Sequence, residues 1–213
     1  MRRTPDVVGL GRAFVCYVAV RTSSSHSLPT LALALIPRAV ALNLALGALA
    51  AALKLPVYLD SVGTIFVAVL AGPVAGMLTG AVSNAVLGIL YSPQLFAFIP
   101  VAVVIGALAG WAARLGAFRS VVGAAIAGVA IGLAAALTSV PIVIHLFGGL
   151  TPSGTGIITI ALRMVFGMSL THAAQVAALS TDVIDKPLSC VLVALLITRL
   201  PARLTERLRT SPA

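Results

Sequence analysis

Two very long stretches of this chain carry no formally charged residue. One runs for 53 residues between Asp60 and Arg114, and the other runs for 43 residues between Arg119 and Arg163. A soluble domain needs charged side chains at short intervals to solvate its surface, whereas a bilayer core requires roughly 20 apolar residues for each helical pass. The sequence therefore predicts an all-α fold in which transmembrane helices form a polytopic bundle.

Composition supports this fold class and excludes one class of partner. Hydrophobic residues make up 60% of the chain, charged residues make up 9%, and 19 glycines favour close contacts between helices in lipid. The net charge of +9 is concentrated in the N-terminal arm, around Arg114 and Arg119, and in the C-terminal tail. This distribution is typical of cytoplasmic segments beside anionic lipid, so we expect a lipid bilayer as partner and no nucleic acid.

The basic residues also predict the topology. We expect residues 1–29 to be a disordered cytoplasmic arm, residues 30–205 to be the membrane domain, and residues 206–213 to be a cytoplasmic tail. The Gly72-Pro73 pair should end a helix and create a hairpin, because proline lacks a backbone donor and restricts the preceding residue. Six passes result, and the expected spans are 30–53, the two arms of the hairpin within 62–91, 96–113, 121–147 and 188–200.

The last third of the chain contains two apolar stretches, but the expected topology permits only one net crossing of the membrane there. Because the arginine-rich tail should be cytoplasmic, we expect residues 157–179 to be re-entrant or to lie against the outer face, and residues 188–200 to span. Seven passes remain an open alternative, since residues 157–179 are about long enough to cross.

Several motifs, taken in order, resemble a known family. Tyr58-Leu-Asp60-Ser61 ends the first outer segment, Gly72-Pro-Val-Ala-Gly76 precedes Gly80 and Asn84, and Asp185-Lys186-Pro187 leads into the last helix. Over about residues 30–205, the chain is similar to the substrate-binding S components of energy-coupling factor (ECF) vitamin transporters. The resemblance implies a six-helix subunit of the bacterial cytoplasmic membrane, with both termini cytoplasmic, that captures a vitamin or cofactor precursor at the outer face. It also implies a transmembrane coupling subunit and two cytoplasmic ATPase subunits as partners.

The same resemblance implies a docking surface of small residues on the first helix. The four-residue spacing occurs twice, at Ala41 and Ala45 and again at Ala48 and Ala52, although Arg38 interrupts the apolar surface. Ordinary packing inside the bundle is an equal alternative, because small residues at this spacing are common in membrane helices.

Charged residues on the expected outer side are the strongest candidates for ligand binding. Both lysines of the chain and three of its five acids occur in two segments, as Lys54, Asp60, Asp182, Asp185 and Lys186. A charge near hydrocarbon is costly unless it is paired, solvated or bound to a ligand. The alternative is that Asp60 caps a helix together with Ser61, and that Asp185 and Lys186 cap and anchor the last helix.

Uncharged polar residues complete the candidate substrate site. Asn84, Ser139 and Gln175 offer hydrogen bonds to a heterocycle, and Tyr58 and Tyr91 offer rings for stacking. Helix packing and interfacial anchoring are the alternatives for these residues.

The sequence shows no catalytic motif, so we expect no enzyme activity. It has no nucleophile elbow, no His-Glu-x-x-His, no phosphate-binding loop and no metal-ligand spacing, and we assign no catalytic residue, no metal and no cofactor. A membrane sensor and a stand-alone secondary carrier are the alternative functions. A site with both signs of charge suits several polar nutrients, and the sequence does not distinguish among them. Examples are thiamine or pyrimidine precursors, riboflavin, pantothenate and a modified purine.

Overall fold

The structure is a computed structural model that describes residues 30–53, 55–151 and 154–199. These residues are mostly helical and contain no strand, which confirms the all-α fold class. The arm 1–29 and the tail 206–213 lie outside the described residues. The α-helices are α2 (Thr30–Ala52), α3 (Val62–Ala71), α4 (Pro73–Leu90), α5 (Ile99–Arg114), α6 (Val121–Phe147), α7 (Gly154–Phe166) and α8 (Leu170–Thr198), and two short 3-10 helices are η1 (Pro93–Phe98) and η2 (Ala117–Arg119).

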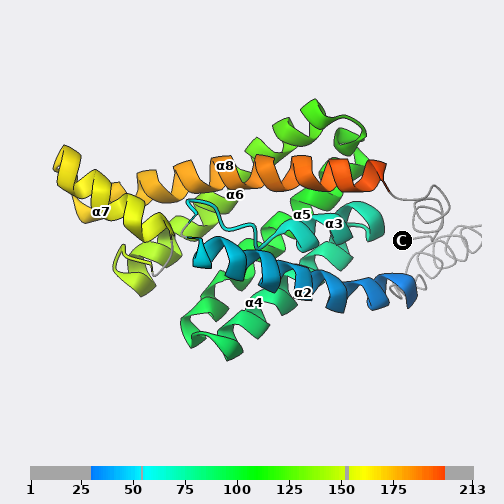
Figure 1. Cartoon of the computed structure of the whole chain (residues 1–213), viewed down its shortest axis with the longest axis horizontal. Helices are drawn as coiled ribbons and strands as arrows, with labels where there is room; N and C mark the ends of the chain where they lie inside the picture. The colour runs from blue at the N-terminus through cyan, green and yellow to red at the C-terminus, as the bar shows by residue number, and fades with distance from the viewer. Residues whose placement is uncertain (1–29, 54, 152–153, 200–213) are drawn as a thin grey trace, which may run out of the picture.

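The helices form two packed groups (Figure 1). Helices α2 to α5 pack against one another, and α6 pairs along its length with α8. Gly128 of α6 lies against Pro187, and Gly132 lies against Asp182, so α6 and α8 run antiparallel at a separation that leaves no room for a side chain at either glycine. Contacts of α5 with α6 and of α3 with α8 join the two groups.

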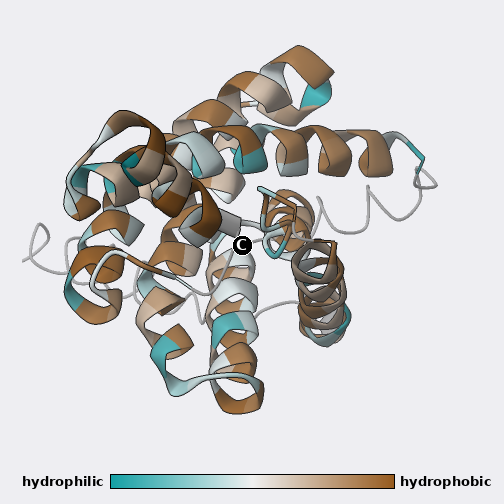
Figure 2. Ribbon diagram, turned by 60° about the vertical axis from the view of Figure 1, so that its left-hand side comes forward, coloured by the Kyte–Doolittle hydropathy of each residue, from teal (hydrophilic) through white to brown (hydrophobic). Residues whose placement is uncertain are grey.

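Four of the described helical segments are long and apolar enough to cross a membrane. They are Leu33–Ala52, Pro73–Leu90, Pro93–Arg114 and Val121–Phe147. Large apolar side chains face outward from them, with Leu137 of α6 75% exposed, and apolar residues predominate along the helices (Figure 2). A monomeric soluble protein rarely exposes such continuous apolar surface, so the chain is a multi-pass membrane protein.

The predicted hairpin at Gly72 is confirmed. Gly72 has a φ of 89°, a conformation that favours glycine, and Pro73 begins α4 where a missing N–H costs nothing. One amide nitrogen, that of Asn43, donates to hydroxyls on both arms, Thr64 in α3 and Ser83 in α4. These residues lie on opposite sides of Gly72 in sequence, so α3 and α4 must run antiparallel.

The boundaries expected in the last third are wrong. Residues 157–179 are divided by a break at Gly167, which has a φ of 62°, and the part from Leu170 onward belongs to α8. Helix α8 has 29 residues, so the expected span 188–200 covers little more than its last third. Helix α7 has 13 residues and is about 20 Å long at 1.5 Å per residue, which is too short to cross a bilayer alone.

The connection between α2 and α3 returns into the bundle instead of remaining at its end. Gly47 lies against Asp60, and Gly63 lies against the backbone carbonyl of Ala39 near the middle of α2. Helix α3 therefore begins beside the middle of α2, and residues 55–61 run back along the last turns of α2 as irregular backbone. Irregular backbone at such depth is tolerated only where protein groups satisfy its polar atoms or where it lines a cavity.

Candidate functional site

Helix α8 carries three charged side chains that are buried among other helices. Asp182 is 6% exposed, Asp185 is 0% exposed and Lys186 is 2% exposed. Residues three and four positions apart share one face of a helix, which brings Asp182, Asp185 and Lys186 together. Removing charged groups from water is costly in free energy, so each of these side chains needs partners that offset this cost.

Asp185 holds the connection between α2 and α3 in place. Its Oδ1 accepts hydrogen bonds from the backbone N–H groups of Tyr58, at 2.9 Å, and Leu59, at 2.8 Å. Its Oδ2 is paired directly with Nζ of Lys186. Leu59 has a φ of 53°, a left-handed conformation that is uncommon for a residue other than glycine. A carboxylate from α8 thus fixes a strained turn of the incoming backbone, and strained turns concentrate at functional sites.

Two further carboxylates surround the same ammonium group. Nζ of Lys186 lies 4.0 Å from Oδ1 of Asp60 and 3.9 Å from Oδ1 of Asp182, which is beyond direct hydrogen bonding. The hydroxyl of Ser139 in α6 donates to Oδ2 of Asp182 at 3.3 Å. Nζ of Lys186 also lies 5.7 Å from the centre of the Tyr58 ring, within the range of a cation–π contact. We call Asp60, Asp182, Asp185 and Lys186 the ionic cluster.

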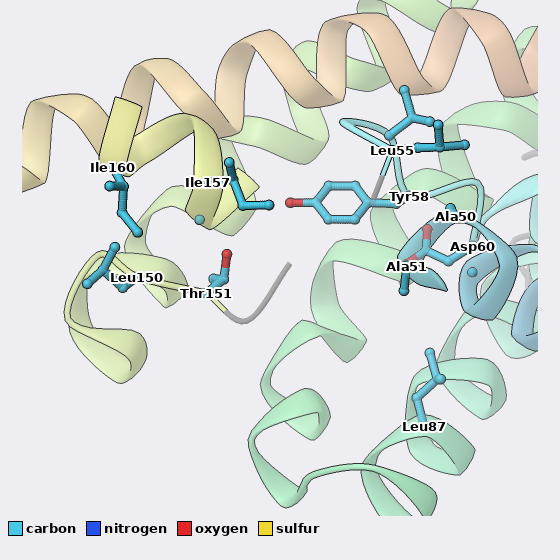
Figure 3. A pocket seen from close by; sticks show the side chains of 13 residues that line it. Ala50, Ala51, Leu55, Tyr58, Asp60, Leu87, Leu150, Thr151, Ile157 and Ile160 are labelled. Atoms are coloured by element: carbon cyan, nitrogen blue, oxygen red, sulfur yellow. The ribbon is translucent and has the colours of Figure 1, made fainter. Parts of the chain in front are cut away.

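A cavity of about 540 Å³ lies beside the ionic cluster (Figure 3). Its volume is within the usual range of small-molecule sites, about 300–1,000 Å³. The lining comes from the end of α2, the α2–α3 connection, α4, the residues before α7 and α7 itself: Gly47, Ala50, Ala51, Leu55, Val57, Tyr58, Asp60, Leu87, Leu150, Thr151, Gly156, Ile157 and Ile160. Tyr58 points across the cavity toward Ile157 of α7, and its hydroxyl is hydrogen-bonded to that of Thr155.

Asp60 connects the ionic cluster with the cavity. It lines the cavity, its side chain is 38% exposed, and it also faces Lys186. Asp185, by contrast, has no exposed surface and uses both oxygens inside the protein. Asp60 is therefore the carboxylate of the cluster that a molecule in the cavity can reach.

The structure brings together six of the nine predicted substrate-binding residues. These are Tyr58, Asp60, Ser139, Asp182, Asp185 and Lys186. The other three lie elsewhere: Asn84 donates only a long bond, 3.4 Å, to the carbonyl of Gly80 in its own helix, Tyr91 is 66% exposed at the end of α4, and Gln175 lies near the start of α8 outside the cavity lining. Lys54 lies outside the described residues.

The helix-capping alternatives for the charged residues are wrong. Ser61 precedes α3 without a capping hydrogen bond from its side chain, and α8 begins at Leu170 with Ser169 as its cap. Asp185 and Lys186 lie in the middle of α8, not at the beginning of the last helix. Both side chains are buried, and Asp185 accepts a backbone N–H of the α2–α3 connection, so neither is an exposed anchor at the end of a helix.

Sequence reasoning missed two residues that shape the site. Asn43 is 0% exposed, and besides its two donor bonds it accepts the N–H of Gly63 at 2.6 Å, which fixes the start of α3 against α2. Thr155 ties α7 to Tyr58. A lone asparagine within an apolar helix was the available signal for Asn43, because such a side chain needs partners in the membrane.

The predicted docking residues share one outward surface of α2. Ala41, Ala45, Ala48 and Ala52 are all exposed, and so is Arg38. Packing within the described part of the bundle therefore does not account for these four alanines. Among the described residues, nothing covers this surface of α2.

The described residues contain no group of three or more His, Cys, Asp or Glu side chains arranged to hold a metal ion. Comparison with protein families, with characterised proteins and with solved structures finds no match to this chain.

Proposed function

We propose that this chain is the substrate-binding membrane subunit of an ECF-type importer and captures a small vitamin or cofactor precursor at the outer face of a bacterial cytoplasmic membrane. One observation carries the proposal: a cavity of ligand size that is bordered by a buried cluster of opposite charges and by irregular backbone inside the bundle. Membrane proteins seldom retain buried ionisable groups without a role in binding or transport.

The position of the cavity supports capture from outside. Gly72 lies beside Arg114 at one end of the bundle, and η2 with Arg119 precedes α6 at that end. The cavity is lined by residues that follow the opposite end of α6. Basic residues favour the cytoplasmic side, so the cavity faces outward and both termini are cytoplasmic in the proposed topology.

The exposed alanines of α2 support the proposed partners. In lipid, helices associate through close van der Waals packing, which small side chains permit. A coupling subunit that packs on Ala41, Ala45, Ala48 and Ala52 would join this chain to two ATPase subunits, which supply the energy for uptake.

Replacing Ala48 by tryptophan is expected to abolish co-purification with the coupling and ATPase subunits, because the bulky ring separates the two helices. The measurement is affinity purification of the tagged chain co-expressed with those subunits. Leu137→Trp on α6, at a site that is already large and 75% exposed, is the matched control and should preserve the complex. An intact complex with the Ala48→Trp variant would remove this surface from partner docking.

The secondary-carrier alternative is favoured by one feature, the non-helical segment that meets buried charges within the bundle. Uptake into vesicles separates the two functions. An importer subunit requires the ATPase subunits and ATP, whereas a carrier works alone on an ion or substrate gradient.

A further inference from the structure

The acidic and basic groups of the ionic cluster are unequal in number. It contains three carboxyl groups and one ammonium group, so the carboxyl groups outnumber the basic group by two among the described residues. Asp185 contacts Lys186 directly, and both side chains of this pair are buried, so a molecule in the cavity does not reach them. The carboxyl groups without a direct ionic partner among the described residues are therefore those of Asp60 and Asp182, both of which lie about 4 Å from Nζ.

The two remaining carboxylates differ in access. Asp182 is buried and accepts the hydroxyl of Ser139. Asp60 is partly exposed in the cavity. A cation in the cavity would stabilise the carboxylate form of Asp60 and pair with it, whereas an anion would meet two nearby carboxyl groups that lack a direct ionic partner.

A second observation is an unmet hydrogen-bonding need near the residues of the ionic cluster, outside the cavity lining. Ser61 directly follows Asp60, is 5% exposed, and its hydroxyl has no partner among the described residues. Two more buried hydroxyls without such a partner, those of Thr181 and Ser189, lie one helical turn before and after Asp185. Buried polar groups normally have partners, so these three hydroxyls mark the surroundings of the ionic cluster as more polar than the rest of the bundle.

The rest of the cavity excludes a bare hydrated ion as its natural occupant. Most of its lining is aliphatic, including Leu55, Leu87, Leu150, Ile157 and Ile160. The Tyr58 ring adds an aromatic surface, and such a ring attracts cations. A ligand that fits these walls needs an apolar or aromatic body attached to its charge.

We propose that the cavity selects small organic cations, with the cationic group held by Asp60 and the apolar or aromatic body packed against Tyr58 and the aliphatic wall. This inference rests on the proposed function and deepens it, because it names the chemical class of the substrate. Neutral and anionic nutrients of similar size are then poor ligands.

Three probes of nearly equal shape test the charge preference. Phenethylamine is a cation at neutral pH, 2-phenylethanol is neutral and phenylacetate is an anion. Binding of each probe to the purified full-length protein is measured by calorimetry and by ligand-observed NMR. We expect phenethylamine to bind at least about tenfold more tightly than the other two, since a hydrogen bond to a charged group is worth more than tenfold in affinity.

Two variants test whether Asp60 is responsible for the preference for the cationic probe. Asp60→Asn should reduce phenethylamine affinity by about tenfold or more and leave 2-phenylethanol affinity nearly unchanged. Asn84→Ala is the matched control, because Asn84 lies outside the cavity lining, and it should leave all three affinities unchanged. Circular dichroism and size-exclusion profiles establish that each variant is folded.

The outcomes separate this inference from the proposed function. Tighter binding of phenylacetate, equal binding of all three probes, or an unchanged phenethylamine affinity in the Asp60→Asn variant would overturn the cation class while leaving the cavity as a binding site. Failure of every probe to bind would contradict the cation class, whereas the proposed function is tested separately by the binding of vitamins and their precursors.

Discussion

Replacing Asp185 by alanine is expected to lower the free energy of unfolding by at least about 3 to 5 kcal/mol. The substitution removes the direct partner of a buried ammonium group, and breaking a buried ion pair on one side costs about that much. It also leaves the N–H groups of Tyr58 and Leu59 without their acceptor, at about 1–3 kcal/mol for each one that finds no other. The measurement is reversible unfolding of the purified protein in detergent, followed by circular dichroism.

The conservative variant separates the two roles of Asp185. Asp185→Asn keeps an oxygen that can accept both backbone N–H groups, and Asp60 and Asp182 remain near Lys186 to share its charge. Its loss of stability should therefore be clearly smaller than that of Asp185→Ala. Stability of Asp185→Ala within about 1 kcal/mol of the native protein would show that Asp185 does not hold the α2–α3 connection in place.

Replacing Asn43 by leucine, a side chain of similar size, is expected to lower the free energy of unfolding by about 2 to 4 kcal/mol. Three hydrogen bonds are lost together, and each contributes about 0.5–1.5 kcal/mol net. The N–H of Gly63 is then left buried without its acceptor, which adds to the loss. Denaturant unfolding in the same detergent measures the effect.

Two neighbouring substitutions serve as controls for Asn43. Ser83→Ala removes one of the three bonds and should cost about 1 kcal/mol. Asn84→Ala removes an amide whose bond, at 3.4 Å, stays within its own helix, so it should cost less than Ser83→Ala. If Asn43→Leu lowered the free energy of unfolding no more than Asn84→Ala, the hydrogen bonds of Asn43 to α3 and α4 would not stabilise the fold.

The sequence was sufficient for the fold class and for most helices. Long uncharged stretches have few structural solutions, and the limits of α2 and α6 agree with those expected from apolar length and flanking charge. The break at Gly72 was predictable because the backbone constraints of glycine and proline are local. Six passes remain a prediction.

Helix α8 was misjudged for a physical reason. Asp182, Asp185, Lys186 and Pro187 are residues that normally mark the end of a span, so the sequence indicated a boundary there. In the structure, Asp185 is paired with Lys186 and with two backbone N–H groups of the α2–α3 connection, and the helix continues through these residues. That compensation depends on tertiary contacts between positions more than 120 residues apart.

The sequence predicted the charged residues of the candidate site but not the position of its cavity. The cost of charges near lipid correctly selected Asp60, Asp182, Asp185 and Lys186 as a group that lies together. Nothing local indicates that residues 55–61 return into the bundle, or that α7 meets Tyr58. The cavity arises from these two segments, so it could not be located from sequence.

The central claim is that the folded chain alone captures a small nutrient in this cavity, and a thermal-shift screen against vitamins and their precursors tests it most directly. A ligand that binds only the folded state stabilises it by about 2.7 kcal/mol at 100 times its Kd, which should raise the Tm by several degrees. We predict such an increase for at least one compound with the native protein, and a much smaller increase for the same compound with the Asp60→Asn variant. An equal increase in both proteins would place binding elsewhere, and no increase with any compound would contradict the account of this chain as a substrate-capturing subunit.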